Sequence, residues 1–226
     1  MGHELGYTYT GNRFRAGVNL YYMDYKDQFV QTGEVSDIGE NLTTNIKDSY
    51  RMGIELKAGA DPASWLTIEG NAALSRNRIK DFDEVVEDWD LGSRTIHYDN
   101  STLAFSPSVL LNGFVNVHYK GWQATWHTNF VSRQYLDNTE CTQRSLPCYS
   151  VSNVSVSYTL RPRKTIKEAV LGLNFNNVFN RRYAASGWVY SAICESYGHT
   201  DDNRYYQIGF IPMAGFTMMG NVTLRF

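Results

Sequence analysis

The segment from Arg181 to Ile211 concentrates side chains that bind ligands through ring stacking and charge. The candidate ligand-binding residues, with one tyrosine from the preceding connection, are Arg182, Trp188, Tyr190, Tyr197, His199, Arg204, Tyr205, Tyr206 and Tyr135. Aromatic and Arg side chains are common anchors of rigid binding surfaces, and ring faces attract cations. The pattern predicts a site for a flat, anionic ligand such as a catecholate or a porphyrin. Ordinary loop and interface aromatics are the alternative interpretation.

Two other groups of polar residues contain side chains of the types that bind metals or act as catalysts. The run 81–90 places six acidic side chains in ten residues, and oxygen-rich loops bind Ca²⁺. Its spacing lacks an EF-hand pattern, which favours a solvated loop. His199 is followed by Thr200, Asp201 and Asp202, but no paired nucleophile or second histidine is near it in the sequence. We therefore predict that the protein is not an enzyme and has no resident metal or cofactor.

Three cysteines leave a choice between a disulfide and free thiols. Cys141 and Cys148 stand in one connection with Pro147 between them, a separation that could close a small ring. We predict a disulfide between them, with two free thiols as the alternative, because the bond depends on an oxidising compartment. The partner of Cys194 cannot be read from the sequence.

Composition limits the class of the protein. The chain has 226 residues and a formal net charge of −2, which gives no indication of a nucleic-acid partner. It lacks a run of about 18 apolar residues, so a transmembrane helix is excluded. Its first residues show no signal-peptide pattern and begin inside an apparent strand. We expect the sequence to be a fragment of a longer protein.

The elements that must position these residues are strands. In the last segment one face consists of Phe216, Met218, Gly220, Val222, Leu224 and Phe226, and the residues between them are mostly polar. Successive side chains of a strand point to opposite faces, and about 11 residues is the length that a tilted strand needs to cross a bilayer. The same alternation predicts strands near 5–10, 14–23, 50–59, 66–75, 109–119, 122–130, 154–160 and 171–175.

The connections between these strands alternate in length. Short turns are predicted near 11–12, 61–64, 120–121 and 161–167, and long connections near 32–44, 79–103, 136–148 and 181–211. Aromatic residues gather near apparent strand ends, as in Tyr22, Tyr50, Tyr119, Trp122, Phe130, Tyr158 and Phe226. The predicted fold is all-β, an antiparallel meander of about nine strands typical of an outer-membrane barrel. A soluble β-sandwich also alternates, but charges such as Glu55 and Lys57 on the polar face suit a wet lumen better.

Several motifs resemble TonB-dependent outer-membrane receptors. Residues 176–183, Asn-Asn-Val-Phe-Asn-Arg-Arg-Tyr, resemble the family's N-N-L-F-N-K-x-Y signature. Residues 212–215, Pro-Met-Ala-Gly, followed by a strand that ends on Phe226, resemble its final strand. Residues 106–108 and 130–139 resemble versions common in Bacteroidetes. The resemblance covers essentially the whole chain.

The resemblance implies that residues 1–226 are the C-terminal part of a 22-stranded transmembrane β-barrel, without the plug domain, TonB box and signal peptide. It assigns a barrel-assembly signal to Phe216, Val222, Leu224 and Phe226. The implied function is uptake of a metal chelate such as a ferric siderophore, haem or cobalamin at the bacterial outer membrane. The implied partners are membrane lipid, the barrel-assembly machinery, and TonB–ExbB–ExbD through the missing N-terminal region. The alternatives are a glycan importer of the same fold and a small complete barrel with an enzymatic or adhesive role.

Overall fold

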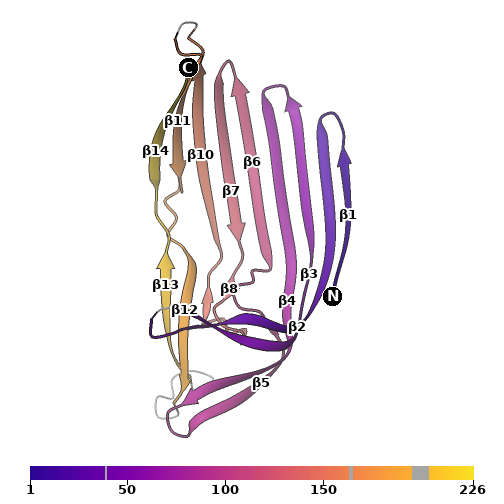
Figure 1. The fold of residues 1–226 in the computed structure, drawn as a ribbon, viewed down its shortest axis with the longest axis vertical. Helices are drawn as coiled ribbons and strands as arrows, with labels where there is room; N and C mark the ends of the chain where they lie inside the picture. Colours follow the sequence, from indigo (N-terminus) through magenta and orange to yellow (C-terminus); the bar gives the residue numbers. More distant parts are fainter. Residues whose placement is uncertain (39, 163–164, 195–203) are drawn as a thin grey trace.

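Antiparallel strands of very unequal length form the molecule (Figure 1). The computed structural model describes residues 1–38, 40–162, 165–194 and 204–226. Within these residues there is no helix that is long and apolar enough to cross a membrane. Hairpins joined at one end by short turns form a tall curved sheet, and longer ribbons extend from its other end (Figure 1).

The tall sheet contains nine strands in the order β1-β2-β3-β4-β6-β7-β10-β11-β14, and all neighbours are antiparallel. The strands are β1 (Gly2–Thr10), β2 (Phe14–Val35), β3 (Asn41–Ala63), β4 (Leu66–Asp88), β6 (Val109–Tyr119), β7 (Trp122–Val131), β10 (Tyr149–Leu160), β11 (Glu168–Asn176) and β14 (Thr217–Arg225). The predicted meander of about nine strands is therefore confirmed.

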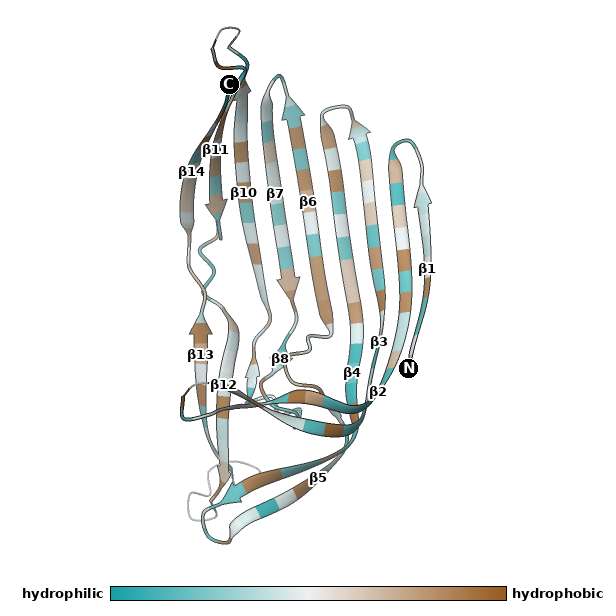
Figure 2. Cartoon of the chain, in the orientation of Figure 1, coloured by the Kyte–Doolittle hydropathy of each residue, from teal (hydrophilic) through white to brown (hydrophobic). Residues whose placement is uncertain are grey.

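The register of this sheet separates an apolar face from a polar face. One row of directly opposed residues consists of Val18, Leu56, Ala72 and Leu111. The adjacent row consists of Gly17, Lys57, Asn71 and Asn112. Hydropathy alternates along the strands in the same way (Figure 2). Leu56 and Leu111 are 44% and 40% exposed, as expected of an apolar face that meets lipid rather than a protein core.

The short turns of the sheet show why the sequence reverses where it does. Lys120 and Gly121, between β6 and β7, both have positive φ, at 46° and 87°. Two such residues form the turn whose twist matches a two-residue hairpin. Next to this turn, the rings of Trp122 and Tyr158 lie 4.6 Å apart. An aromatic pair at this level fits the interfacial belt predicted from the sequence.

The terminal strand carries the residues assigned to an assembly signal. Phe216 precedes β14, Val222 and Leu224 lie within it, and Phe226 follows it. All four side chains are exposed, and β14 pairs only with β11 among the described residues. The geometry places the four residues on one apolar face, but their role as an assembly signal stays a prediction.

The long connections differ from their prediction as loops, because most of them are strands. The paired ends of β2 and β3 form a ribbon that fills much of 32–44. The end of β4 pairs with β5 (Gly92–Thr102) in a second ribbon, which fills much of 79–103. The strands β12 (Ala184–Ile193) and β13 (Arg204–Pro212) form a hairpin that accounts for most of 181–211. Two short strands, β8 (Gln134–Tyr135) and β9 (Ser145–Leu146), pair beside them. Backbone hydrogen bonds can pair two strands whatever the pattern of their side chains, so the absence of apolar alternation gave no sign of these strands in the sequence.

Among the described residues, both clusters of packed buried side chains lie in these extensions. We call residues 28–38, 40–46, 77–103, 134–149, 184–194 and 204–212 the ribbon layer. One cluster consists of Val30, Ile46, Ile79 and Leu103, with Phe82 packed against it. A second cluster consists of Leu136, Leu146 and Val189, with Phe105, Ala184, Tyr206 and Ile208 around it. The ribbon layer is therefore a packed unit at one end of the sheet (Figure 1).

Candidate functional site

The β12–β13 hairpin divides the predicted ligand-binding residues between two faces. Tyr190 is paired with Gln207 and Ala192 with Tyr205, so side chains two positions apart share a face. One face carries Trp188, Tyr190 and Tyr205, and we call it the aromatic face. The other face carries Arg204 and Tyr206 and packs into the ribbon layer.

The aromatic face is held in place by residues of the neighbouring β4–β5 ribbon. The Tyr205 ring lies 5.3 Å from the ring of Trp89, which follows β4. The Tyr190 hydroxyl donates a hydrogen bond of 2.6 Å to Glu87 Oε2. Trp188 lies over Gly209, where an added Cβ would be 2.1 Å from Trp188 Nε1. The three rings are only partly buried, so they present fixed surface for stacking.

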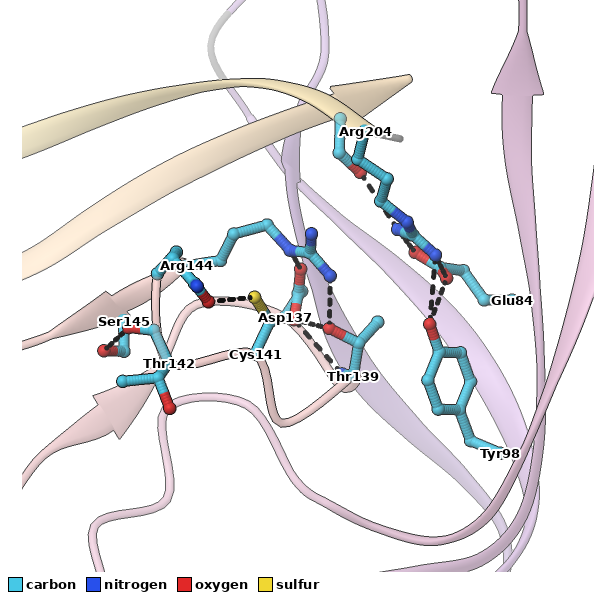
Figure 3. A network of polar contacts seen from close by, with 11 residues as sticks. Glu84, Tyr98, Asp137, Thr139, Cys141, Thr142, Arg144, Ser145 and Arg204 are labelled. Atoms are coloured by element: carbon cyan, nitrogen blue, oxygen red, sulfur yellow. Dashed lines mark hydrogen bonds and ion pairs between the residues drawn. The ribbon is translucent and has the colours of Figure 1, made fainter. Parts of the chain in front are cut away.

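Arg204 is buried on the opposite face and is bound to the β4–β5 ribbon (Figure 3). Its guanidinium nitrogens contact both carboxylate oxygens of Glu84, the Nη1 to Oε1 distance being 2.8 Å. Arg204 Nη2 also donates to the Tyr98 hydroxyl at 3.0 Å, and that hydroxyl donates to Glu84 Oε2 at 3.1 Å. Burial, and then the Glu84 carboxylate, raises the pKa of Tyr98 to about 12. We call these three residues the Arg204 network.

The remaining predicted residues do not share one location. Tyr206 packs against the second buried cluster. Tyr135 lies on β8, where its carbonyl oxygen accepts a hydrogen bond from the Phe105 amide at 2.9 Å. Arg182 is exposed between β11 and β12. Tyr197 and His199 lie outside the described residues. Of the predicted residues that the structure describes, it thus brings together Trp188, Tyr190 and Tyr205 on one face.

A second network includes the buried pair of Asp137 and Arg144 (Figure 3), and through Asn138 it connects segments that are far apart in the sequence. Arg144 Nε donates to Asp137 Oδ2 at 2.6 Å, with both side chains less than a tenth exposed. The neighbouring Asn138 accepts a hydrogen bond from the Ala104 amide at 2.8 Å and donates to the Gln31 carbonyl at 2.9 Å. Asn138 therefore joins the β2–β3 ribbon, the end of β5 and the 136–148 connection.

The predicted disulfide is not formed in this structure. Cys141 and Cys148 are both free thiols, and Cys148 is exposed. Cys141 Sγ instead lies 3.1 Å from Gln143 Oε1, and the Cys141 carbonyl accepts the Arg144 amide in a tight turn. The buried Asp137–Arg144 pair closes the connection that the disulfide was expected to close. Cys194 is buried.

The electrostatics of the ribbon layer are dominated by carboxylates. Four of its arginines, Arg78, Arg94, Arg144 and Arg204, each contact a carboxylate. The aromatic face is bordered by Glu87, which sequence reasoning had placed in a solvated acidic loop. Trp89 was missed for the same reason. The sequence feature that could have identified Trp89 is its position inside the acidic run, because a large aromatic side chain among charged residues is unusual for a solvated loop.

The described residues of this arrangement suit contact with a ligand through ring faces. Stacked rings and hydroxyls suit a flat or ring-bearing molecule, and the nearby carboxylates favour one that is neutral or positively charged at its rim. Arg204, which was expected to attract an anion, is neutralised by Glu84. The aromatic face is therefore the candidate site, with a charge preference different from the one the sequence predicted.

Comparison with known proteins gives consistent results for family and fold. A family model described as "TonB dependent receptor-like, beta-barrel" matches residues 2–178. Among solved structures, the copper transporter OprC superposes with a TM-score of 0.65 at 15% identity, covering 98% of this chain and 30% of that one. The ferric citrate transporter FecA superposes with a TM-score of 0.62 at 18% identity, and the match covers 97% of this chain and 30% of that one.

The ferric yersiniabactin uptake receptor FyuA from Yersinia pestis gives a TM-score of 0.59 at 17% identity, covering 98% of this chain and 28% of that one. This chain thus spans less than a third of the length of these structures. Sequence comparison with curated proteins finds no match. At these identities the similarity to solved structures shows a shared fold, and the ligands in their names belong to those proteins.

Proposed function

The chain belongs to the TonB-dependent receptor-like β-barrel family, and we propose that the receptor containing it takes up a metal chelate across the bacterial outer membrane. Ferric siderophores, haem and cobalamin are the candidate classes, and the Glu87 carboxylate beside the aromatic face favours a chelate whose rim is neutral or positive over an anionic one. Residues 1–226 supply the last strands of the barrel and its ribbon layer in this proposal. The plug domain and the TonB-binding segment lie elsewhere in the receptor. The family consists of transport receptors and not of enzymes.

The observation that carries this proposal is the aromatic face. Trp188, Tyr190 and Tyr205 are aligned on one face of a hairpin that is anchored by a buried ion pair on its other face. Rigid aromatic side chains lose little conformational entropy when they bind, which makes them effective contacts for a planar chelate. Their position in the ribbon layer, at the end of the sheet opposite the short turns, is where a ligand approaching from outside would first meet the barrel (Figure 1).

The proposal is tested by binding to the full-length receptor purified in detergent. Quenching of tryptophan fluorescence would be measured with a ferric catecholate, haem, cobalamin and a neutral oligosaccharide. We expect saturable binding of one metal chelate, and at least a tenfold weaker Kd for Trp188→Ala and Tyr205→Ala, since dominant aromatic contacts typically contribute about 2 kcal/mol or more. Trp122→Phe, at the turn end of the sheet, is the matched control and should bind as the wild type.

Two outcomes would overturn the proposal. Saturable binding of the oligosaccharide without binding of any metal chelate would identify a glycan importer of the same fold. Unchanged chelate binding by Trp188→Ala and Tyr205→Ala would remove the aromatic face from the site. Circular dichroism and heat-modifiable migration of each variant would establish that its barrel is folded.

A further inference from the structure

The β4–β5 ribbon carries a second group of possible ligand atoms, separate from the aromatic face. Asp83 is paired directly with His97, and Asp81 with Asp99. Because these positions alternate by two along each strand, all four side chains project from the same face of the ribbon. Asp81, Asp83 and His97 are exposed. Backbone pairing on both sides of the group fixes the spacing of the four Cα atoms.

The two distances from His97 Nδ1 to the aspartate oxygens are close to those between ligand atoms around a bound metal ion. His97 Nδ1 lies 2.8 Å from Asp83 Oδ1 and 3.5 Å from Asp81 Oδ1, and one ligand atom from each residue lies within 4.8 Å of the others. A divalent transition ion with bonds of about 2.1 Å holds adjacent ligand atoms about 3.0 Å apart in an octahedron and about 3.4 Å apart in a tetrahedron. An ion could therefore enter with little movement of the side chains.

The fourth residue orients the histidine. His97 Nε2 lies 3.1 Å from Asp99 Oδ1. When Nε2 carries a proton and donates it to Asp99, the lone pair of Nδ1 faces Asp81 and Asp83. A histidine that binds a metal through one nitrogen commonly donates the other N–H to a carboxylate, which fixes the ring and its tautomer. Asp99 is placed to do this.

The charge of this group also favours a cation. Within the part of the chain that the structure describes, Asp81, Asp83 and Asp99 form ion pairs only with His97 and with no lysine or arginine. Asp81 and Asp99 are like charges directly opposite in a sheet, an arrangement that destabilises strand pairing. A divalent ion would supply the charge that the surrounding residues do not.

We propose that Asp81, Asp83 and His97 bind a divalent transition-metal cation on the β4–β5 ribbon, with Asp99 positioning His97. One imidazole and two carboxylates suit Zn²⁺, Mn²⁺ or Ni²⁺ better than Ca²⁺ or Mg²⁺, which prefer oxygen ligands alone. Solvent completes the coordination, because all three side chains face water. The site is independent of the proposed transport function, since it requires neither the aromatic face nor any other segment of the receptor.

The test is calorimetric titration of Zn²⁺ into the full-length receptor, purified in detergent and first treated with a chelator. We expect one site of micromolar or tighter Kd that weakens at least tenfold in Asp83→Asn and in His97→Gln. Asp99→Asn should also weaken it, by about tenfold, as loss of an outer hydrogen bond to a metal-binding histidine does. Asp37→Asn removes the same charge from the β2–β3 connection and is the matched control.

The proposal fails if Zn²⁺ binding is absent, because His97 would then only form ion pairs with its neighbours. It also fails if Asp83→Asn and His97→Gln bind as tightly as Asp37→Asn. Ca²⁺ binding of equal affinity with the same dependence on Asp83 would refute the choice of metal class. None of these metal-binding measurements depends on transport. A failure of this proposal can therefore be distinguished from a failure of the proposed function.

Discussion

Glu84→Gln should release the β12–β13 hairpin from the β4–β5 ribbon without unfolding the barrel. The substitution keeps the size of the side chain but removes the charge that compensates Arg204, whose side chain is 2% exposed, against 15% for Glu84. Loss of one partner of a buried ion pair typically costs about 3–5 kcal/mol. Because Glu84 retains some contact with water, we take the lower end, about 3 kcal/mol, which corresponds to a roughly 100-fold larger opening equilibrium.

Hydrogen–deuterium exchange of the full-length receptor in detergent is the appropriate assay, since it reports local opening of a single hairpin. Peptides from β12 and β13 should exchange roughly 100-fold faster in Glu84→Gln, while peptides from β6, β7 and β10 stay unchanged. Glu140→Gln is the matched control, because it removes the same charge from the more exposed ion pair with Arg78. Surface pairs contribute at most about 1 kcal/mol, so this control should differ little from the wild type.

The double variant Glu84→Gln/Arg204→Met separates the ion pair from simple loss of packing. If an unpaired buried charge is the cause, removing Arg204 as well should restore much of the protection, because apolar replacements of buried ion pairs are often neutral. Additive effects of the two substitutions would refute the reasoning, as would equal exchange in Glu84→Gln and Glu140→Gln. Either result would mean that the Arg204 network does not hold the aromatic face.

Three further predictions concern a turn, a buried amide and the cysteines. Gly121→Ala should destabilise the barrel by about 1–2 kcal/mol and lower the temperature of its heat-modifiable transition. Gly121 has a φ of +87°, and the new Cβ would lie 2.9 Å from the backbone carbonyl oxygen of Thr159. Gly113→Ala is the control and should not lower this temperature, because there is open space around Gly113. Asn138→Ala should leave the Ala104 amide and the Gln31 carbonyl without their side-chain partner and accelerate exchange at the β2–β3 ribbon. The expected loss is about 1 kcal/mol, because both hydrogen bonds are only partly buried. Cys148 and Cys141 should react with maleimide without reductant, whereas labelling only after reduction would restore the predicted disulfide.

The tall sheet could be predicted because the membrane imposes its pattern. In barrels of this family each strand meets lipid on one side and a wet lumen on the other, so apolar and polar residues such as Leu56 and Lys57 are expected to alternate along the span. The nine strands followed from that constraint, whereas the turn predicted at 61–64 lies at 64–65, because β3 continues to Ala63. The residue types of the turns gave further local information. At Lys120 and Gly121, for example, the sequence predicts a tight turn, and both residues have the positive φ that such a turn requires.

The ribbon layer could not be predicted in the same way, because nothing forces its strands to alternate between apolar and polar. The segment 79–103 forms long paired strands while carrying charges on both faces. The sequence placed Arg204 and Tyr205 together as ligand contacts, but adjacent residues in a strand point in opposite directions. Alternation of Val189 and Ile193 with Tyr190 was the signal that could have separated the buried face of that hairpin from its aromatic face.

The location of the buried core explains how such a layer can hold a site. A barrel wall is only one strand thick, and its apolar side chains face lipid, so it provides no interior in which to fix a binding surface. The ribbon layer provides that interior itself, through Leu136, Leu146 and Val189 under one hairpin and Ile79 under another. Because Arg204 and Glu84 join these hairpins through buried charges, a ligand that displaces the aromatic face must also disturb the β4–β5 ribbon. Binding at Trp188 and Tyr205 should therefore alter exchange at Tyr98, even though no ligand contact is expected there.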